Sequence, residues 1–111
     1  MKIIDLVNAL NLKVFSGSAG INNEVRGGYV SDLLSDVMGN ANEGEVWITL
    51  QTHRNILAIA SLKDLSAIIL VKGLIPDQST IDKSNEENIP ILGTDDQTFR
   101  IAGRLYEWIN G

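Results

Sequence analysis

The sequence predicts an α/β domain, a three-layer-like arrangement with a mostly parallel sheet, βαβ crossovers and a short N-terminal helix. Three observations support this fold class. From Glu45 onward, strand-like and helix-like segments alternate, as expected for right-handed crossovers between parallel strands. Residues 67–71 form an unbroken apolar run, which is typical of a strand buried on both faces. The length of 111 residues is close to the commonest domain size, so we expect residues 1–111 to form one domain.

The first half of the chain is expected to hold two helices and two strands. Ser31 or Asp32 can cap the second helix, because both side chains accept hydrogen bonds from a first helical turn. Gly27 and Gly28 indicate close packing; a nucleotide loop is the weaker alternative, since G-x-G-x-x-G is missing. The expected elements are a helix over 3–10, a strand over 12–15, a turn over 16–20, a strand over 25–30 and a helix that ends between 39 and 44.

The second half contains the strand and helix alternation. Thr94 and Gln97 have the spacing of a capping box, which predicts that the last helix starts there. The expected elements are a strand over 46–50, a helix over 55–65, a strand over 67–71, a helix from 76 to about 88, a strand over 90–92 and the last helix.

Composition excludes several classes of function. The net charge of −5, from 14 acidic and 9 basic residues, opposes binding to nucleic acid and to acidic membrane surfaces. With no cysteine and one histidine, we expect no disulfide, no metal site and no cofactor. No signal-peptide core and no apolar run of the ~20 residues that span a membrane is visible, so we expect a cytoplasmic protein.

Two polar turns follow neighbouring strands and indicate a binding site. Parallel strands bring both turns to one edge of the sheet, where the N–H groups of a helix start attract negative charge. We therefore expect a small anionic metabolite there, and no catalytic residue. The predicted ligand-binding residues are Gln51, Thr52, His53, Arg54, Lys72, Gly73 and Thr94.

Each candidate also has a structural explanation. Arg54 lies in a first helical turn, where positive charge is disfavoured, so its anionic partner is a ligand, a dimer partner, or Asp95 or Asp96. His53 is a general base or phosphoacceptor, or an exposed residue at a helix start. Gly73 closes over a phosphate or permits a positive φ in a turn. The two aspartates hold Mg²⁺ or cap the last helix.

The last helix has two apolar faces. One face can cover the sheet, and the other needs a second partner. That partner is the N-terminal helix or, alternatively, a second copy of the chain in a homodimer. The first face carries Phe99, Ala102, Tyr106 and Ile109, and the second carries Ile101, Leu105 and Trp108.

Residues from Gly28 to Trp108 resemble the DRTGG domain. Its name joins Asp-Arg, which opens the helix after one strand, and Thr-Gly-Gly, which follows the next strand. Arg54 and Gly73 match this pattern. His53 stands in place of Asp, Val71 in place of Thr and Lys72 in place of Gly. Segment 90–94 and the helix after it also resemble the end of the family's domain.

The resemblance implies a regulatory or assembly module. Relatives form the regulatory part of some phosphotransacetylases and of CBS-containing pyrophosphatases, and the N-terminal domain of HPr kinase is a more distant relative. We therefore expect a non-catalytic, ligand-sensing and dimerising module. One alternative is a protein-interaction accessory of a redox, hydrogenase or kinase system, and a second is a small phosphotransfer enzyme that uses His53.

Overall fold

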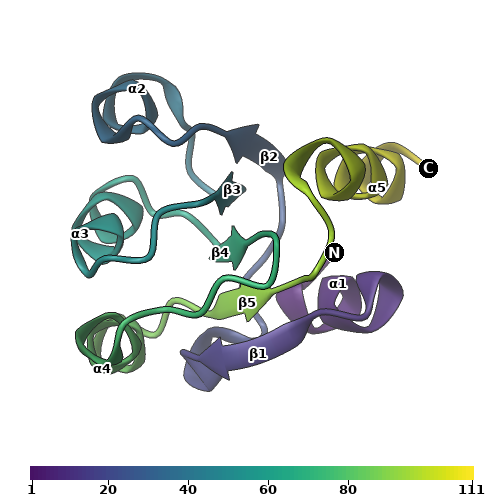
Figure 1. Cartoon of the computed structure of the whole chain (residues 1–111). Helices are drawn as coiled ribbons and strands as arrows, with labels where there is room; N and C mark the ends of the chain where they lie inside the picture. The colour runs from purple at the N-terminus through teal and green to yellow at the C-terminus, as the bar shows by residue number, and fades with distance from the viewer.

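The computed structural model describes all residues, 1–111, and places one five-stranded sheet between two layers of helices (Figure 1). The strand order is β1-β5-β4-β3-β2, in which β2 to β5 are parallel and β1 is antiparallel to β5. This arrangement confirms the predicted fold class. The strands are β1 (Lys13–Ser16), β2 (Gly27–Val30), β3 (Glu45–Thr49), β4 (Ala67–Leu70) and β5 (Ile91–Gly93).

The crossover helices all cover one face of the sheet, because every β2-to-β5 connection has the same hand. Figure 1 shows α2, α3 and α4 on that face, and α1 and α5 on the other. The helices are α1 (Ile3–Leu10), α2 (Leu34–Asn40), α3 (Asn55–Leu62), α4 (Gln78–Glu87) and α5 (Thr98–Asn110), and a 3₁₀ turn spans Ser18–Gly20. None of these helices is of a length and hydropathy that would cross a bilayer.

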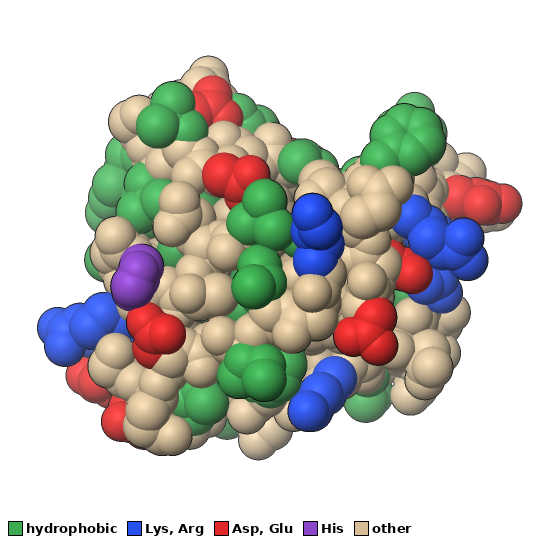
Figure 2. All heavy atoms as spheres, in the orientation of Figure 1, with side chains coloured by type: hydrophobic (Ala, Val, Ile, Leu, Met, Phe, Trp, Pro, Cys, Tyr) green, Lys and Arg blue, Asp and Glu red, His purple; other side chains and the backbone are tan.

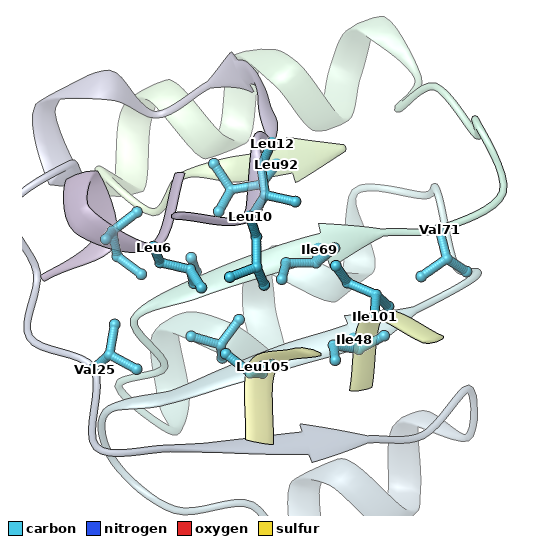
Figure 3. Packing of buried hydrophobic residues seen from close by; sticks show 13 residues of the cluster. Leu6, Leu10, Leu12, Val25, Ile48, Ile69, Val71, Leu92, Ile101 and Leu105 are labelled. Carbon is cyan, nitrogen blue, oxygen red and sulfur yellow. The ribbon is translucent and has the colours of Figure 1, made fainter. Parts of the chain in front are cut away.

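Two hydrophobic clusters fill the space between the layers. Every residue of β4 is buried, as expected for a central parallel strand. On the α2 to α4 side, Trp47 is fully buried and its indole Nε1 donates to the carbonyl oxygen of Ser31 at 2.8 Å. On the other side, Ile101 and Leu105 of α5 and Leu6 of α1 pack on the sheet (Figure 3).

Glycine permits the close approach of α5 to the edge strand. A Cβ at Gly28 would lie 2.8 Å from Cδ2 of Leu105, so a larger residue would force the Leu105 side chain to move. The expectation of close packing at this glycine is confirmed.

Two of the predicted helix starts are wrong. The residue before α2 is Leu33, not Ser31 or Asp32, and Gly39 lies within the helix. The Asp32 carboxylate instead bonds the end of β3. The capping box of Thr94 and Gln97 is also absent. The Thr94 hydroxyl accepts from the amide of Asp96, two residues later, which delays the helix to Thr98.

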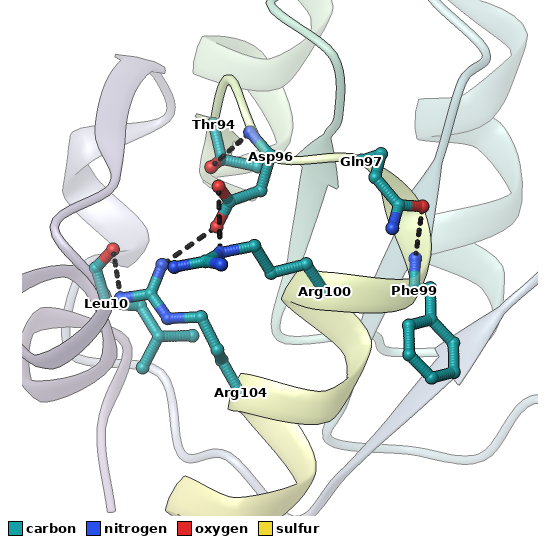
Figure 4. A network of polar contacts seen from close by, with 7 residues as sticks. All are labelled: Leu10, Thr94, Asp96, Gln97, Phe99, Arg100 and Arg104. Atoms are coloured by element: carbon teal, nitrogen blue, oxygen red, sulfur yellow. Dashed lines mark hydrogen bonds and ion pairs between the residues drawn. The ribbon is translucent and has the colours of Figure 1, made fainter.

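The Gln97 side chain caps α5 by accepting from the Phe99 amide at 3.0 Å. The expected capping role of the adjacent aspartates is therefore wrong. Asp96 lies before α5 and instead pairs with Arg100 and Arg104, which both belong to that helix (Figure 4).

Candidate functional site at the carboxyl edge of the sheet

The carboxyl ends of four parallel strands meet at one edge of the sheet. The antiparallel strand β1 starts at the same edge, because Lys13 pairs with Gly93. After β4 the chain enters α4 on one face, and after β5 it enters α5 on the other (Figure 1). Open α/β sheets bind ligands at such points, where the connections diverge to opposite faces.

The turn after β3 is held by Asp32, which comes from the loop after β2. Its carboxylate accepts from the Thr49 hydroxyl at 2.9 Å and from the Leu50 amide at 2.7 Å. The Gln51 side-chain amide donates to the backbone oxygen of Asp32 at 2.9 Å. Asp32 therefore fixes where the turn begins. The sequence does not predict this role, because an aspartate just before a helix is expected to cap it.

The same turn is tied to the start of α4. The Thr52 carbonyl accepts from the Asp77 amide at 3.3 Å and from the buried Thr80 hydroxyl at 2.7 Å. His53 Nδ1 lies 2.9 Å from an Asp77 carboxylate oxygen. Figure 2 views the molecule from this side and shows the purple histidine beside an acidic side chain. His53 is exposed, and no hydroxyl group is hydrogen-bonded to it, so the pair has no nucleophile to activate.

Arg54 has no carboxylate partner within the chain. It lies just before α3 and lines a shallow hollow of about 180 Å³. The other wall of this hollow belongs to α4 and includes Asp82 and Lys83. The pKa of the Lys83 ammonium is raised, mainly by its hydrogen bond to Glu87 and secondly by the negative charge of Glu86. The suggested salt bridges of Arg54 with Asp95 or Asp96 within one chain are absent.

The turn after β4 is bonded to the turn after β5. The Lys72 amide donates to the Asp96 carbonyl and the Gly73 amide to the Thr94 carbonyl, both at 2.9 Å. Both turn residues have positive φ, 59° for Lys72 and 70° for Gly73. Gly73 therefore has the positive φ that the sequence predicts, and these two amides are not free to bind an anion.

A hollow of about 430 Å³ lies beside this pair of turns. Gly73 and Thr94 are the two predicted site residues that line it. The Lys13 ammonium lies 4.9 Å from the centre of the Phe15 ring. A Cβ at Gly93 would come within 2.4 Å of that ring, so only glycine leaves the ring in place. The other lining residues are Leu10, Asn11, Leu74, Ile75, Asp95, Asp96 and Arg104.

The polar wall of this hollow is built on α5. Asp96 accepts from Arg104 Nη1 at 2.9 Å and lies 3.3 Å from Arg100 Nε, and Arg104 Nη2 donates to the Leu10 carbonyl at 3.2 Å (Figure 4). Sequence reasoning missed Lys13, Phe15 and Arg104. Their place depends on β1 lying antiparallel beside β5, which no local pattern revealed.

The predicted site residues thus fall into two groups on one edge. Thr52, His53 and Arg54 lie together beside the start of α4, where Arg54 lines the small hollow, and Gln51 bonds to Asp32. Lys72, Gly73 and Thr94 lie together, and two of them line the larger hollow. No group of three or more His, Asp or Glu side chains is arranged to hold a metal ion.

The fold and the edge define a small α/β domain with a polar, mixed-charge site where parallel strands end. A model of the DRTGG domain matches residues 5–108, and the chain belongs to this family. No curated protein matches the chain significantly.

Among solved structures, the chain is similar to the CBS and DRTGG domains of the regulatory region of Clostridium perfringens pyrophosphatase, complexed with its activator diadenosine tetraphosphate. The TM-score is 0.71 at 18% identity, over 94% of this chain and 45% of the other. At this identity the likeness establishes a shared fold. This chain corresponds to less than half of that regulatory region.

Proposed function

We propose that the chain is a non-catalytic regulatory module that binds a small phosphorylated or carboxylate metabolite at the carboxyl edge and works as a homodimer. Membership of the DRTGG family supports a regulatory role, since the similar pyrophosphatase region is regulatory and is complexed with a nucleotide activator. The cytoplasmic location and the single-domain organisation stay predictions.

Three cations without a salt-bridge partner carry the proposal. Lys13, Arg54 and Lys72 all lie on the carboxyl edge of a chain with net charge −5, and none of them pairs with a carboxylate. Unpaired positive charge gathered at one edge favours an anionic ligand. Lys13 lies in β1 and Arg54 lies in the turn after β3, and these two strands are three strand spacings apart, roughly 14 Å. That span favours an extended anion over a single phosphate.

The larger hollow offers an apolar wall beside these charges. Phe15, Leu74 and Ile75 line it next to Lys13, so an apolar or aromatic part of the ligand can pack there while its anionic part faces the cations. A nucleotide has this combination of parts.

A protein partner is the second candidate. Leu33, Leu50 and Ile75 are exposed large apolar side chains on or next to the same edge. They suit a protein surface better than a small anion. We propose no catalytic role for His53, because Asp77 is the only polar partner of its side chain.

A thermal-shift screen with nucleotides, diadenosine tetraphosphate, acyl phosphates and small carboxylates tests the proposal. A ligand present at 100 times its Kd should stabilise the fold by about 2.7 kcal/mol. Arg54→Ala and Lys13→Ala should each weaken binding roughly 10- to 150-fold, the value of one charge-assisted bond. Arg54→Lys should also weaken it, because the fork geometry is lost.

Lys63→Ala is the matched control. Lys63 follows α3 near the opposite edge, has no salt bridge, and its removal changes the net charge equally. Equal losses in Lys63→Ala and Lys13→Ala would mean that net charge alone acts. If no compound in the screen shifts the melting temperature, the ligand-sensing role is wrong and the protein partner is favoured.

A further inference from the structure

One side of α5 exposes two large aromatic side chains to solvent. Phe99 is 84% exposed and Tyr106 is 72% exposed. Together with Gly103 and Asn110 they recur at spacings of four, three and four, which places them along one side of the helix. We call these four residues the α5 stripe. Leu105 is buried against the sheet of its own chain, so the expected second apolar face of the helix is not available to a partner.

Gly103 stands in the middle of the stripe with no neighbour. A Cβ there would meet nothing within 4 Å, and glycine in a helix interior costs about 0.5–1 kcal/mol relative to alanine. Nothing within the chain requires a glycine at this position. A glycine there leaves room for the backbone of a second helix to approach closely.

The stripe is symmetric about this glycine. Phe99 lies four residues before Gly103 and Tyr106 three residues after it. If a second copy runs antiparallel across a two-fold axis at Gly103, the Phe99 ring of each copy lies beside Tyr106 of the other. The two helices then cross at their smallest residue.

Charge selects the antiparallel arrangement. Arg100 follows Phe99 at one end of the stripe, and Glu107 follows Tyr106 at the other. The two-fold axis at Gly103 brings Arg100 of each copy to Glu107 of the other. A parallel arrangement would set Arg100 against Arg100, which repels. Arg100 is exposed and contacts Asp96 through Nε, so its terminal nitrogens are available.

A groove next to the stripe can receive the aromatic ring of the second copy. It has a volume of about 420 Å³ and lies between α5 and the edge strand β2, with Ala102, Tyr106 and Ile109 on its helical side. Figure 2 shows a notch between the α2 and α5 sides of the molecule, where Figure 1 draws β2. Two aromatic residues supply about half of the ~800 Å² per partner of a standard interface, and the groove offers further apolar area.

We propose that two copies of the chain associate through antiparallel α5 helices, with the two-fold axis at Gly103, mutual Phe99–Tyr106 contacts and two Arg100–Glu107 ion pairs. This inference rests on the dimer of the proposed function and assigns its axis and contacts.

Sedimentation equilibrium across the micromolar range tests the interface. Gly103→Arg places a long cation at the axis and should give a monomer at all concentrations. Gly39→Arg is the control, since Gly39 also lies in a helix and a Cβ there meets nothing within 4 Å. It should stay as dimeric as the original chain. Both variants should keep the circular dichroism spectrum, because neither side chain meets an obstacle in the monomer.

A charge exchange tests the orientation. Arg100→Glu and Glu107→Arg should each raise the dimer Kd about 2- to 30-fold, because each removes two exposed ion pairs. The double exchange should restore it. A monomeric original chain, a dimeric Gly103→Arg variant or a failed restoration would each overturn the inference. Ligand binding by the Gly103→Arg monomer, measured in the thermal-shift screen, separates this outcome from failure of the ligand-sensing role.

Discussion

Lys72 keeps a left-handed backbone conformation that its side chain disfavours. A φ of 59° costs a residue with a Cβ roughly 1–2 kcal/mol, and glycine avoids this cost. We predict that Lys72→Gly folds with equal or greater stability, by up to about 1 kcal/mol after the entropy of glycine is counted. The same change should weaken anion binding. Chemical unfolding and ligand titration measure the two effects, and greater stability without loss of affinity would remove Lys72 from the proposed site.

Asp32 is the residue that places the turn after β3. Asp32→Ala removes the acceptor for the Leu50 amide and the buried Thr49 hydroxyl, so we predict a loss of about 1–3 kcal/mol in urea unfolding. Asp82→Ala is the control, because Asp82 accepts only from the exposed Gln78 side chain. It should stay within about 0.5 kcal/mol of the original chain. Similar losses in both variants would contradict the role of Asp32.

The sequence predicts the two turns at the carboxyl edge but not the contacts that shape them. Arg54 and Gly73 lie on the same edge of the sheet, as predicted, because the patterns of strands 46–50 and 67–71 indicate buried, parallel strands. Asp32 was misread because an aspartate before a helix is usually its cap. Its bonds to Thr49 and Leu50 join segments 17 and 18 residues apart, and such pairings depend on strand order.

At the scale of elements, β2 and α2 are joined by one hydrogen bond. The Tyr29 hydroxyl donates to an Asp36 carboxylate oxygen at 2.8 Å. This bond is the main cause that lowers the pKa of Asp36 and raises the pKa of Tyr29. A carboxyl whose pKa is lowered by folding adds stability above its unfolded pKa and loses it as the pH falls through the folded pKa.

We therefore predict that Tyr29→Phe lowers the melting temperature at neutral pH, and that the difference from the original chain shrinks as the pH falls through the acidic range. Thermal unfolding at several pH values measures it. Tyr106→Phe is a control for hydroxyl loss, since the Tyr106 hydroxyl has no partner within the chain. A melting difference for Tyr29→Phe that stays constant with pH would contradict the assignment.

Elements with strong periodicity were predictable, and elements set by distant partners were not. Helix 3–10 and the central strands were recognised because burial imposes their patterns. The start of α5 was not, because Gly73 and Lys72 bind the carbonyls of Thr94 and Asp96 and keep that segment a loop. The orientation of β1 was equally hidden. The strand β1 has only four residues, and their sequence does not indicate that they pair with β5. That pairing creates the larger hollow.

At the scale of the whole molecule, one carboxylate lies between the proposed ligand site and the proposed dimer interface. Asp96 pairs with Arg104, which lines the larger hollow, and with Arg100, which flanks the α5 stripe. An anion that binds Arg104 competes with Asp96 and leaves its carboxylate to hold Arg100 more firmly. Arg100 is then less available to Glu107 of the second copy.

We predict that each bound ligand weakens the dimer by up to about fivefold in Kd, because it changes one exposed Arg100–Glu107 pair by up to about 1 kcal/mol. Because linkage is reciprocal, the Gly103→Arg monomer should bind the ligand more tightly than the dimer by a matching factor. Sedimentation with and without ligand measures the change in the dimer Kd. Ligand titration of the Gly103→Arg monomer and of the original dimer measures the change in ligand affinity. If both affinities stay unchanged while Arg104→Ala weakens ligand binding, Asp96 does not couple the two sites and they act independently.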